Sequence, residues 1–164
     1  MNKLLLAIGL TLFITMGNAQ TTLYFKGEWT KKNKNELYAG IFKITITREN
    51  AVNGELLWTY LATDETDSFL LQHYKGKKGR RAIEFVEGSY NPSSHDMYFE
   101  GMKRTDPDDV IGLDKYSLKL SADKKALYGR TDDNGTNEGM FYGVQMNAAA
   151  GKQELDAIKK KLKN

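Results

Sequence analysis

The chain has 164 residues, a net charge of +3 at neutral pH and no cysteine. This length is typical of a single domain of about 100 to 200 residues, and the near balance of charge argues against a nucleic-acid partner. The lack of cysteine excludes disulfide bonds, thiolate metal sites and cysteine nucleophiles, so the fold must rely on packing and hydrogen bonds.

The first segment, Met1–Ala19, has the layout of a cleaved secretory signal peptide. Lys3 gives a positive start, residues 4–16 form an apolar run, and residues 17–19 place small side chains where a signal peptidase recognises them. The apolar run is too short to span a bilayer as a stable helix. We therefore expect an exported protein, periplasmic or secreted, that is cleaved after Ala19 and has no transmembrane segment.

After this segment, apolar and polar residues alternate in about eight short stretches. In one of them Phe42, Ile44 and Ile46 alternate with polar residues, which is the period of a half-buried β-strand. The connectors are rich in Asn, Asp, Gly, Ser and Pro, which favour turns. The predicted strands cover residues 23–29, 42–47, 55–60, 83–90, 97–102, 115–121, 126–131 and 140–146.

Short connections between these stretches predict an antiparallel meander, which closes into a barrel or folds into a β-sandwich. Glycine inside a strand pattern favours the barrel, because strands that close a barrel bend sharply at glycines. We therefore predict an all-β, eight-stranded antiparallel barrel over residues 20–147, with the sandwich as the alternative. The glycines that carry this argument are Gly27, Gly40, Gly88, Gly101, Gly129 and Gly143.

Two segments depart from the alternation and are expected to be helical. Residues 64–74 place apolar side chains at helical spacing, which predicts a short helix across one mouth of the barrel. Within residues 148–164, Leu155, Ile158 and Leu162 form one apolar helical face and lysines follow in the last turns. This pattern predicts a C-terminal amphipathic helix.

The sequence Gly27-Glu28-Trp29 in the first predicted strand resembles the Gly-x-Trp signature of lipocalin-like and avidin-like barrels. In those barrels the tryptophan closes one end, so the resemblance implies a lipocalin-like or calycin-like fold.

A longer resemblance, over roughly residues 82–143, is to a module seen in exported and multidomain bacterial proteins without an assigned activity. Asn137 stands where such a module has an aromatic residue. The resemblance implies a fold and no reaction. It is carried by residues 84–92, 106–107, 111–121, 127–129, 134–136 and 141–143.

The barrel interior is the first candidate site, because eight strands enclose a space that side chains fill or that holds one small ligand. The expected interior residues are Phe25, Trp29, Phe42, Ile44, Trp58, Tyr60, Phe99, Tyr116, Leu118 and Tyr142. Six of them are predicted to bind a small apolar or amphipathic ligand: Trp29, Phe42, Trp58, Tyr60, Phe99 and Tyr116. A solid barrel that acts through its surface is the competing interpretation.

The second candidate site is a basic run in residues 75–81. Its five cations predict binding of an anionic glycan or a partner protein through charge, and the competing interpretation is a solvated loop. The five residues are Lys75, Lys77, Lys78, Arg80 and Arg81.

Little in the sequence indicates catalysis, and we expect neither an enzyme nor a cofactor. The two histidines, His73 and His95, are not at a metal-binding spacing. No nucleophile elbow or phosphate loop is present.

Acidic residues suggest two further roles. Four carboxylates in residues 105–114 suit a calcium ion, but an Asp-initiated turn is the preferred interpretation and no metal is expected. Glu84, Glu87 and Glu100 are of the type that hydrolyses glycosides, but we expect them to face outward.

Overall fold

The computed structural model describes residues 20–32, 36–64, 66, 68–132 and 138–162. The predicted signal peptide, residues 1–19, lies outside the described residues.

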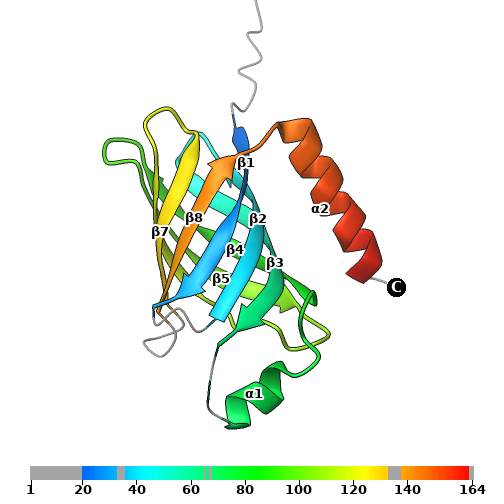
Figure 1. The fold of residues 1–164 in the computed structure, drawn as a ribbon. Helices are drawn as coiled ribbons and strands as arrows, with labels where there is room; N and C mark the ends of the chain where they lie inside the picture. The colour runs from blue at the N-terminus through cyan, green and yellow to red at the C-terminus, as the bar shows by residue number, and fades with distance from the viewer. Residues whose placement is uncertain (1–19, 33–35, 65, 67, 133–137, 163–164) are drawn as a thin grey trace, which may run out of the picture.

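Eight antiparallel strands form a closed barrel in chain order, and β8 completes it by pairing with β1 (Figure 1). This arrangement confirms the predicted all-β barrel over the sandwich. The strands are β1 (Thr21–Lys31), β2 (Glu36–Ile46), β3 (Ala51–Thr63), β4 (Arg81–Asn91), β5 (Asp96–Thr105), β6 (Lys115–Leu120), β7 (Ala126–Asp132) and β8 (Gly139–Gln145).

Glycines lie where neighbouring strands approach each other most closely. Gly27 of β1 is opposite Gly143 of β8, and a Cβ atom on Gly27 would collide with the β8 backbone. Gly88 of β4 has the same relation to the β5 backbone at Phe99. These glycines therefore allow the strands to bend and to approach each other closely, as a closed barrel requires.

The middle of the barrel is filled by its own aromatic side chains. The rings of Phe42 and Phe141 stack with centroids 4.0 Å apart, and those of Phe99 and Tyr116 stack at 4.8 Å. Trp58 meets Phe42 edge to face at 4.9 Å. All five side chains are buried, so this layer is a packed core and not an open channel.

The prediction that Tyr142 faces the interior is wrong. Its side chain is 59% exposed, on the same outer face of β8 as Met140 and Val144. The inward position belongs to its neighbour Phe141, because successive side chains of a strand point to opposite faces. Two adjacent aromatic residues left the choice of face open in the sequence.

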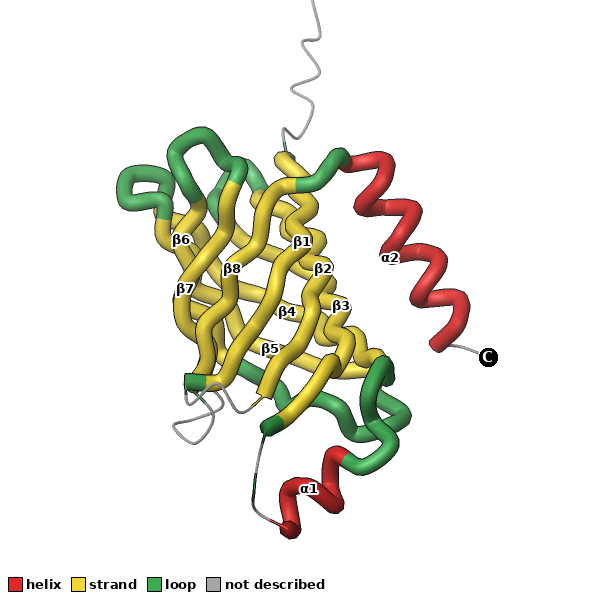
Figure 2. Tube along the Cα trace, viewed as in Figure 1, coloured by secondary structure: helices red, strands yellow, loops and turns green. Residues whose placement is uncertain are grey.

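Helix α2 (Ala148–Leu162) lies on the outside of the barrel, along β1 and β2 (Figure 2). Its apolar face confirms the predicted amphipathic helix, and Lys26 of β1 and Glu154 form an ion pair of 3.0 Å. A Cβ atom on Gly151 would overlap the ring of Tyr24, so glycine at this position allows α2 to pack closely against β1. The buried residues of this second, outer core are Tyr24, Ile41, Leu57, Ile83, Leu155 and Ile158.

Helix α1 (Ser68–Tyr74) connects β3 to β4 and lies at one end of the barrel (Figure 1). It begins four residues later than the predicted segment 64–74. We call this end the α1 mouth; here β1, β3, β5 and β7 end and the even-numbered strands begin. Neither α1 nor α2, the two helices of the described residues, combines the length and apolarity needed to cross a membrane.

Candidate ligand-binding site

A cavity of about 250 Å³ lies at the α1 mouth. Its walls come from the ends of the strands, from α1 and from the connection between β5 and β6. The aromatic layer of the barrel core closes it on the inner side. The lining residues are Trp29, Glu36, Tyr38, Trp58, His73, Tyr74, Glu84, Arg104, Asp109, Val110, Ile111, Gly112 and Asp114.

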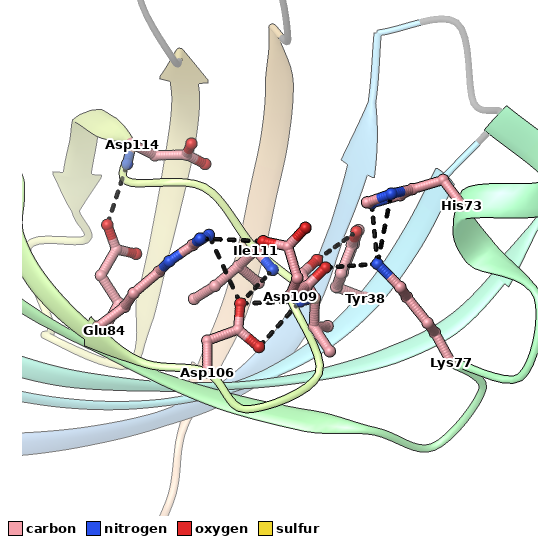
Figure 3. A network of polar contacts seen from close by, with 10 residues as sticks. Tyr38, His73, Lys77, Glu84, Asp106, Asp109, Ile111 and Asp114 are labelled. Carbon is pink, nitrogen blue, oxygen red and sulfur yellow. Dashed lines mark hydrogen bonds and ion pairs between the residues drawn. The ribbon is translucent and has the colours of Figure 1, made fainter. Parts of the chain in front are cut away.

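The β5–β6 connection, residues 106–114, forms one wall because Asp106 holds it in a tight loop (Figure 3). The Asp106 carboxylate accepts hydrogen bonds from the N–H groups of Val110 at 2.8 Å and Ile111 at 2.9 Å. Val110 is buried against the barrel core, and its carbonyl accepts a hydrogen bond of 3.0 Å from the Tyr38 hydroxyl. The loop is therefore fastened both internally and to β2.

The acidic residues of this loop pair with groups of the chain itself. Arg104 lies 2.9 Å from Asp109 and 3.6 Å from Asp106, while Asp108 lies 3.7 Å from Arg80. No group of three or more His, Cys, Asp or Glu residues among the described positions is arranged to hold a metal ion. The geometry matches the preferred sequence interpretation, an Asp-initiated turn.

Aromatic side chains connect the barrel wall to α1. The Trp29 indole N–H donates to the Thr131 hydroxyl at 2.5 Å, and Tyr38 meets Trp29 edge to face at 5.3 Å. Tyr38 also contacts Tyr60 at 5.2 Å, and Tyr60 stacks on Tyr74 of α1 at 5.0 Å. Burial raises the pKa of the Tyr38 and Tyr74 hydroxyls, so both stay neutral and can donate hydrogen bonds.

Glu84 places a carboxylate in the wall of the cavity. The residue is 1% exposed; its carboxylate accepts hydrogen bonds from the Tyr116 hydroxyl and, at 3.0 Å, from the Asp114 N–H. Gly101 of β5 makes room, because a Cβ atom there would overlap the Glu84 carboxylate. Burial raises the pKa of Glu84 to about 7, opposed by hydrogen bonds from Tyr116 and the Asp114 N–H, by the nearby Trp58 side chain and by the positive charge of Arg104.

The prediction that Glu84 faces outward is wrong, whereas Glu87 and Glu100 are exposed as expected. Glu84 alternates with Ala82 and Val86, and these two small apolar residues face the interior. This alternation is the sequence signal that would have found it. The three glutamates do not assemble into a carboxylate pair inside the barrel.

Glu36 is a second buried carboxylate that the sequence interpretation missed. It is 5% exposed, lines the cavity from the first residue of β2 and forms an ion pair of 2.8 Å with Lys31. The alternation along β2 is the signal that indicates its position, because Glu36 lies two residues before Tyr38 and six before Phe42, which both face inward. A glutamate beside a polar turn gives no other sign of burial.

The structure divides the six predicted ligand-binding residues into two groups. Trp29 and Trp58 line the cavity. The remaining four are buried and fill the barrel centre or support α1; they are Phe42, Tyr60, Phe99 and Tyr116. Tyr116 still influences the cavity, because its hydroxyl holds Glu84.

The basic run of residues 75–81 does not form a single charged patch. Lys77 donates to the Asp109 carbonyl at 2.6 Å, and its amine lies 2.9 Å from His73 Nε2 (Figure 3). Arg80 faces Asp108, as described above. These two cations thus join the segment after α1 to the β5–β6 connection.

The other three basic residues point elsewhere. Lys75 and Lys78 are exposed and border a shallow groove beside Leu71 of α1. Arg81 begins β4 and is half-buried. The segment therefore contributes both to the rim of the cavity and to the outer surface.

Comparisons of the chain with protein-family models, with curated proteins and with solved structures give no match. The eight-stranded barrel that Gly27-Glu28-Trp29 led us to expect is present, and no match shows a relation to lipocalin-like or avidin-like proteins. In that architecture Trp29 lies at the α1 mouth, where it lines the cavity.

Proposed function

We propose that this protein is a binding module that holds one small amphipathic ligand in the cavity at the α1 mouth. The observation that carries the proposal is the cavity itself, which combines tryptophan walls with the buried Glu84 carboxylate. Small-molecule sites typically join apolar and aromatic walls to a few fixed polar groups. Drug-sized pockets begin at about 300 Å³, so a cavity of about 250 Å³ suits a smaller molecule.

The cavity is better suited to binding than to chemistry. The polar groups that face it are held by hydrogen bonds that fix their orientation: Glu84 by Tyr116, and Tyr38 by the Val110 carbonyl. Nucleophilic catalysis uses a nucleophile beside a base, and glycoside hydrolysis uses two carboxylates across a bond. The described lining residues include no serine, threonine or cysteine, and two of the four lining carboxylates, Glu36 and Asp109, are held in ion pairs.

Export is a further part of the proposal, and it rests on residues 1–19 alone. A lipocalin-like relationship rests on Gly27-Glu28-Trp29 together with the eight-stranded barrel. Both fit a binding protein that works outside the cytoplasm, in the periplasm or after secretion.

The alternative function, binding of an anionic glycan or a partner protein through residues 75–81, has less support. Lys77 and Arg80 are engaged with the β5–β6 connection. Only Lys75 and Lys78 of the five cations are both exposed and without a contact to that connection in the described structure.

Tryptophan fluorescence of the full chain tests the proposal, because both tryptophans of the sequence line the cavity. The probes are 2-phenylethylamine, 2-phenylethanol and 3-phenylpropionate at millimolar concentrations. We expect a saturable change with at least one of them. If none gives a saturable change, the proposed function is wrong.

A pair of Gly112 variants locates the binding. Gly112 lines the cavity, and a Cβ atom there would contact only Asp114 Oδ1, at 3.7 Å. Gly112→Phe should therefore occupy the cavity and abolish the response, whereas Gly112→Ala should retain it. Equal responses from the two variants would place the probe elsewhere on the molecule.

A further inference from the structure

The cavity carries an excess of negative charge. Of its described lining residues, four are carboxylates and one is a guanidinium, with His73 at the exposed rim. An anionic ligand would be repelled by this lining, since like charges in a partly desolvated site are unfavourable. The four carboxylates are Glu36, Glu84, Asp109 and Asp114, and the guanidinium is Arg104.

Two of the positive groups at the cavity pair with carboxylates, and a third, the Lys77 amine, contacts the Asp109 carbonyl and the His73 ring. Lys31 pairs with Glu36 at 2.8 Å. Arg104 is shared between Asp106 and Asp109, at 3.6 and 2.9 Å. Glu84 differs from these pairs: within the described part of the chain it has no direct ion pair, although the charge of Arg104 acts on it and opposes the rise of its pKa.

Glu84 also retains capacity to accept hydrogen bonds. A carboxylate offers about four lone-pair positions. In this structure Glu84 accepts from the Tyr116 hydroxyl and the Asp114 N–H. Both donors are neutral, so an ammonium donor would add to this carboxylate the direct ion pair that neither of them can form.

Aromatic rings surround the same space. Trp29, Trp58, Tyr38 and Tyr74 all line the cavity. The face of an aromatic ring attracts a cation within about 6 Å, and tryptophan does so most strongly. The rings also offer apolar contact to the uncharged part of a ligand.

We propose that the ligand is a small organic cation, an amine with an apolar body, whose ammonium group binds Glu84 while its body contacts Trp29 and Trp58. This inference rests on the proposed function, because it specifies the chemical class that the cavity accepts. The ammonium supplies donors to the buried carboxylate, and the aromatic walls take the apolar part. A neutral alcohol of the same shape can donate one uncharged hydrogen bond to Glu84, and an anionic carboxylate can donate none.

Three probes of matched shape test the charge preference by calorimetry on the full chain at pH 8, above the Glu84 pKa of about 7, where the carboxylate is ionised. 2-Phenylethylamine is the cation, 2-phenylethanol is the neutral analogue, and 3-phenylpropionate is the anion. We expect the amine to bind about tenfold or more tightly than the alcohol, and the propionate to bind most weakly. This comparison uses the unaltered protein, so it does not depend on whether a variant folds.

Glu84→Gln identifies the carboxylate responsible, with Glu87→Gln on the exposed face of the same strand as the matched control. We expect Glu84→Gln to lower amine affinity to about that of the alcohol and to leave alcohol affinity nearly unchanged. Glu87→Gln should change neither.

The outcomes separate the two proposals. If the alcohol or the propionate binds as tightly as the amine, or if Glu84→Gln weakens all three probes equally, the cation inference is wrong and the binding function stands. If no probe binds and the tryptophan fluorescence does not change, the proposed function is wrong and the inference falls with it.

Discussion

Titration of the Glu84 carboxyl group should make the free energy of unfolding depend on pH. Groups facing it come from β5 (Arg104), from β6 (Tyr116) and from the loop before β6 (Asp114). Its pKa rises from 4.5 to about 7 on folding, mainly through burial. Between these values the native state binds the proton more tightly than the unfolded chain, so stability falls as pH rises.

We therefore expect the wild-type protein to lose about 3 kcal/mol of stability, relative to Glu84→Gln, between pH 4.5 and 7. Glutamine imitates the protonated acid and does not titrate, so the variant should lack this slope. Urea unfolding at pH 4.5, 6 and 8 measures the difference. Glu87→Gln serves as the control, and parallel pH profiles for wild type and Glu84→Gln would refute the expectation.

Gly151 gives a second prediction: replacing it by alanine should lower the free energy of unfolding, whereas this replacement in a helix usually raises it. Replacing glycine by alanine within a helix normally stabilises it by about 1 kcal/mol. Here the added methyl would overlap the Tyr24 ring, and overpacking costs about 1 to 3 kcal/mol. We expect Gly151→Ala to be destabilising in urea unfolding.

The matched test of this sign is a double-mutant cycle with Tyr24→Ala. Once the ring is removed, the same Gly151→Ala change should become neutral or stabilising. Equal effects of Gly151→Ala in both backgrounds would show that the ring is not the cause.

Among the elements, the β5–β6 connection depends on one side chain. Asp106 holds two N–H groups of the loop, and its carboxylate is almost fully buried. Asp106→Ala leaves these donors without their acceptor, which should cost about 1 to 3 kcal/mol and speed hydrogen exchange at Val110 and Ile111. Asp108→Ala is the control, because the polar contact of the Asp108 side chain among the described residues is a loose one, 3.7 Å from Arg80. Unchanged exchange in Asp106→Ala would contradict this account of the loop.

At the scale of the whole molecule, ionic strength separates a cavity site from a surface site. Salt screens exposed charges strongly and buried pairs weakly. Raising the salt concentration from about 50 to about 500 mM should change amine affinity less than about threefold. Binding of an anionic polymer through residues 75–81 would instead weaken about tenfold or more. A steep salt dependence of amine binding would move the site to the surface.

The sequence predicts the barrel well because its signals are local. Alternation such as Phe42-x-Ile44-x-Ile46 and glycines such as Gly27 act on neighbouring strands, and both keep their meaning in the structure. The cavity is harder to predict, because it depends on contacts between distant residues. Tyr38 fixes the loop at Val110, and only that contact turns an acidic connector into a cavity wall.

The burial of charged side chains is also hard to predict from the sequence. Glu36 and Glu84 occupy inward positions of their strands. Glutamate is rarely buried, so its residue type predicts an outward side chain even where the strand alternation predicts an inward one. Trp29 and Trp58 were found because their residue type and their parity agree. Functional positions are often those where the two signals conflict.

Because β1 pairs with β8, the barrel can close only after its last strand has been made. The first strand of the barrel keeps one edge open until the last strand arrives, and such an edge readily pairs with other chains. Closure of the barrel therefore waits until β8 has been made, and such long-range strand pairing is slow. Until then the chain lacks its closed barrel, which suits passage through a narrow membrane pore in the proposed export.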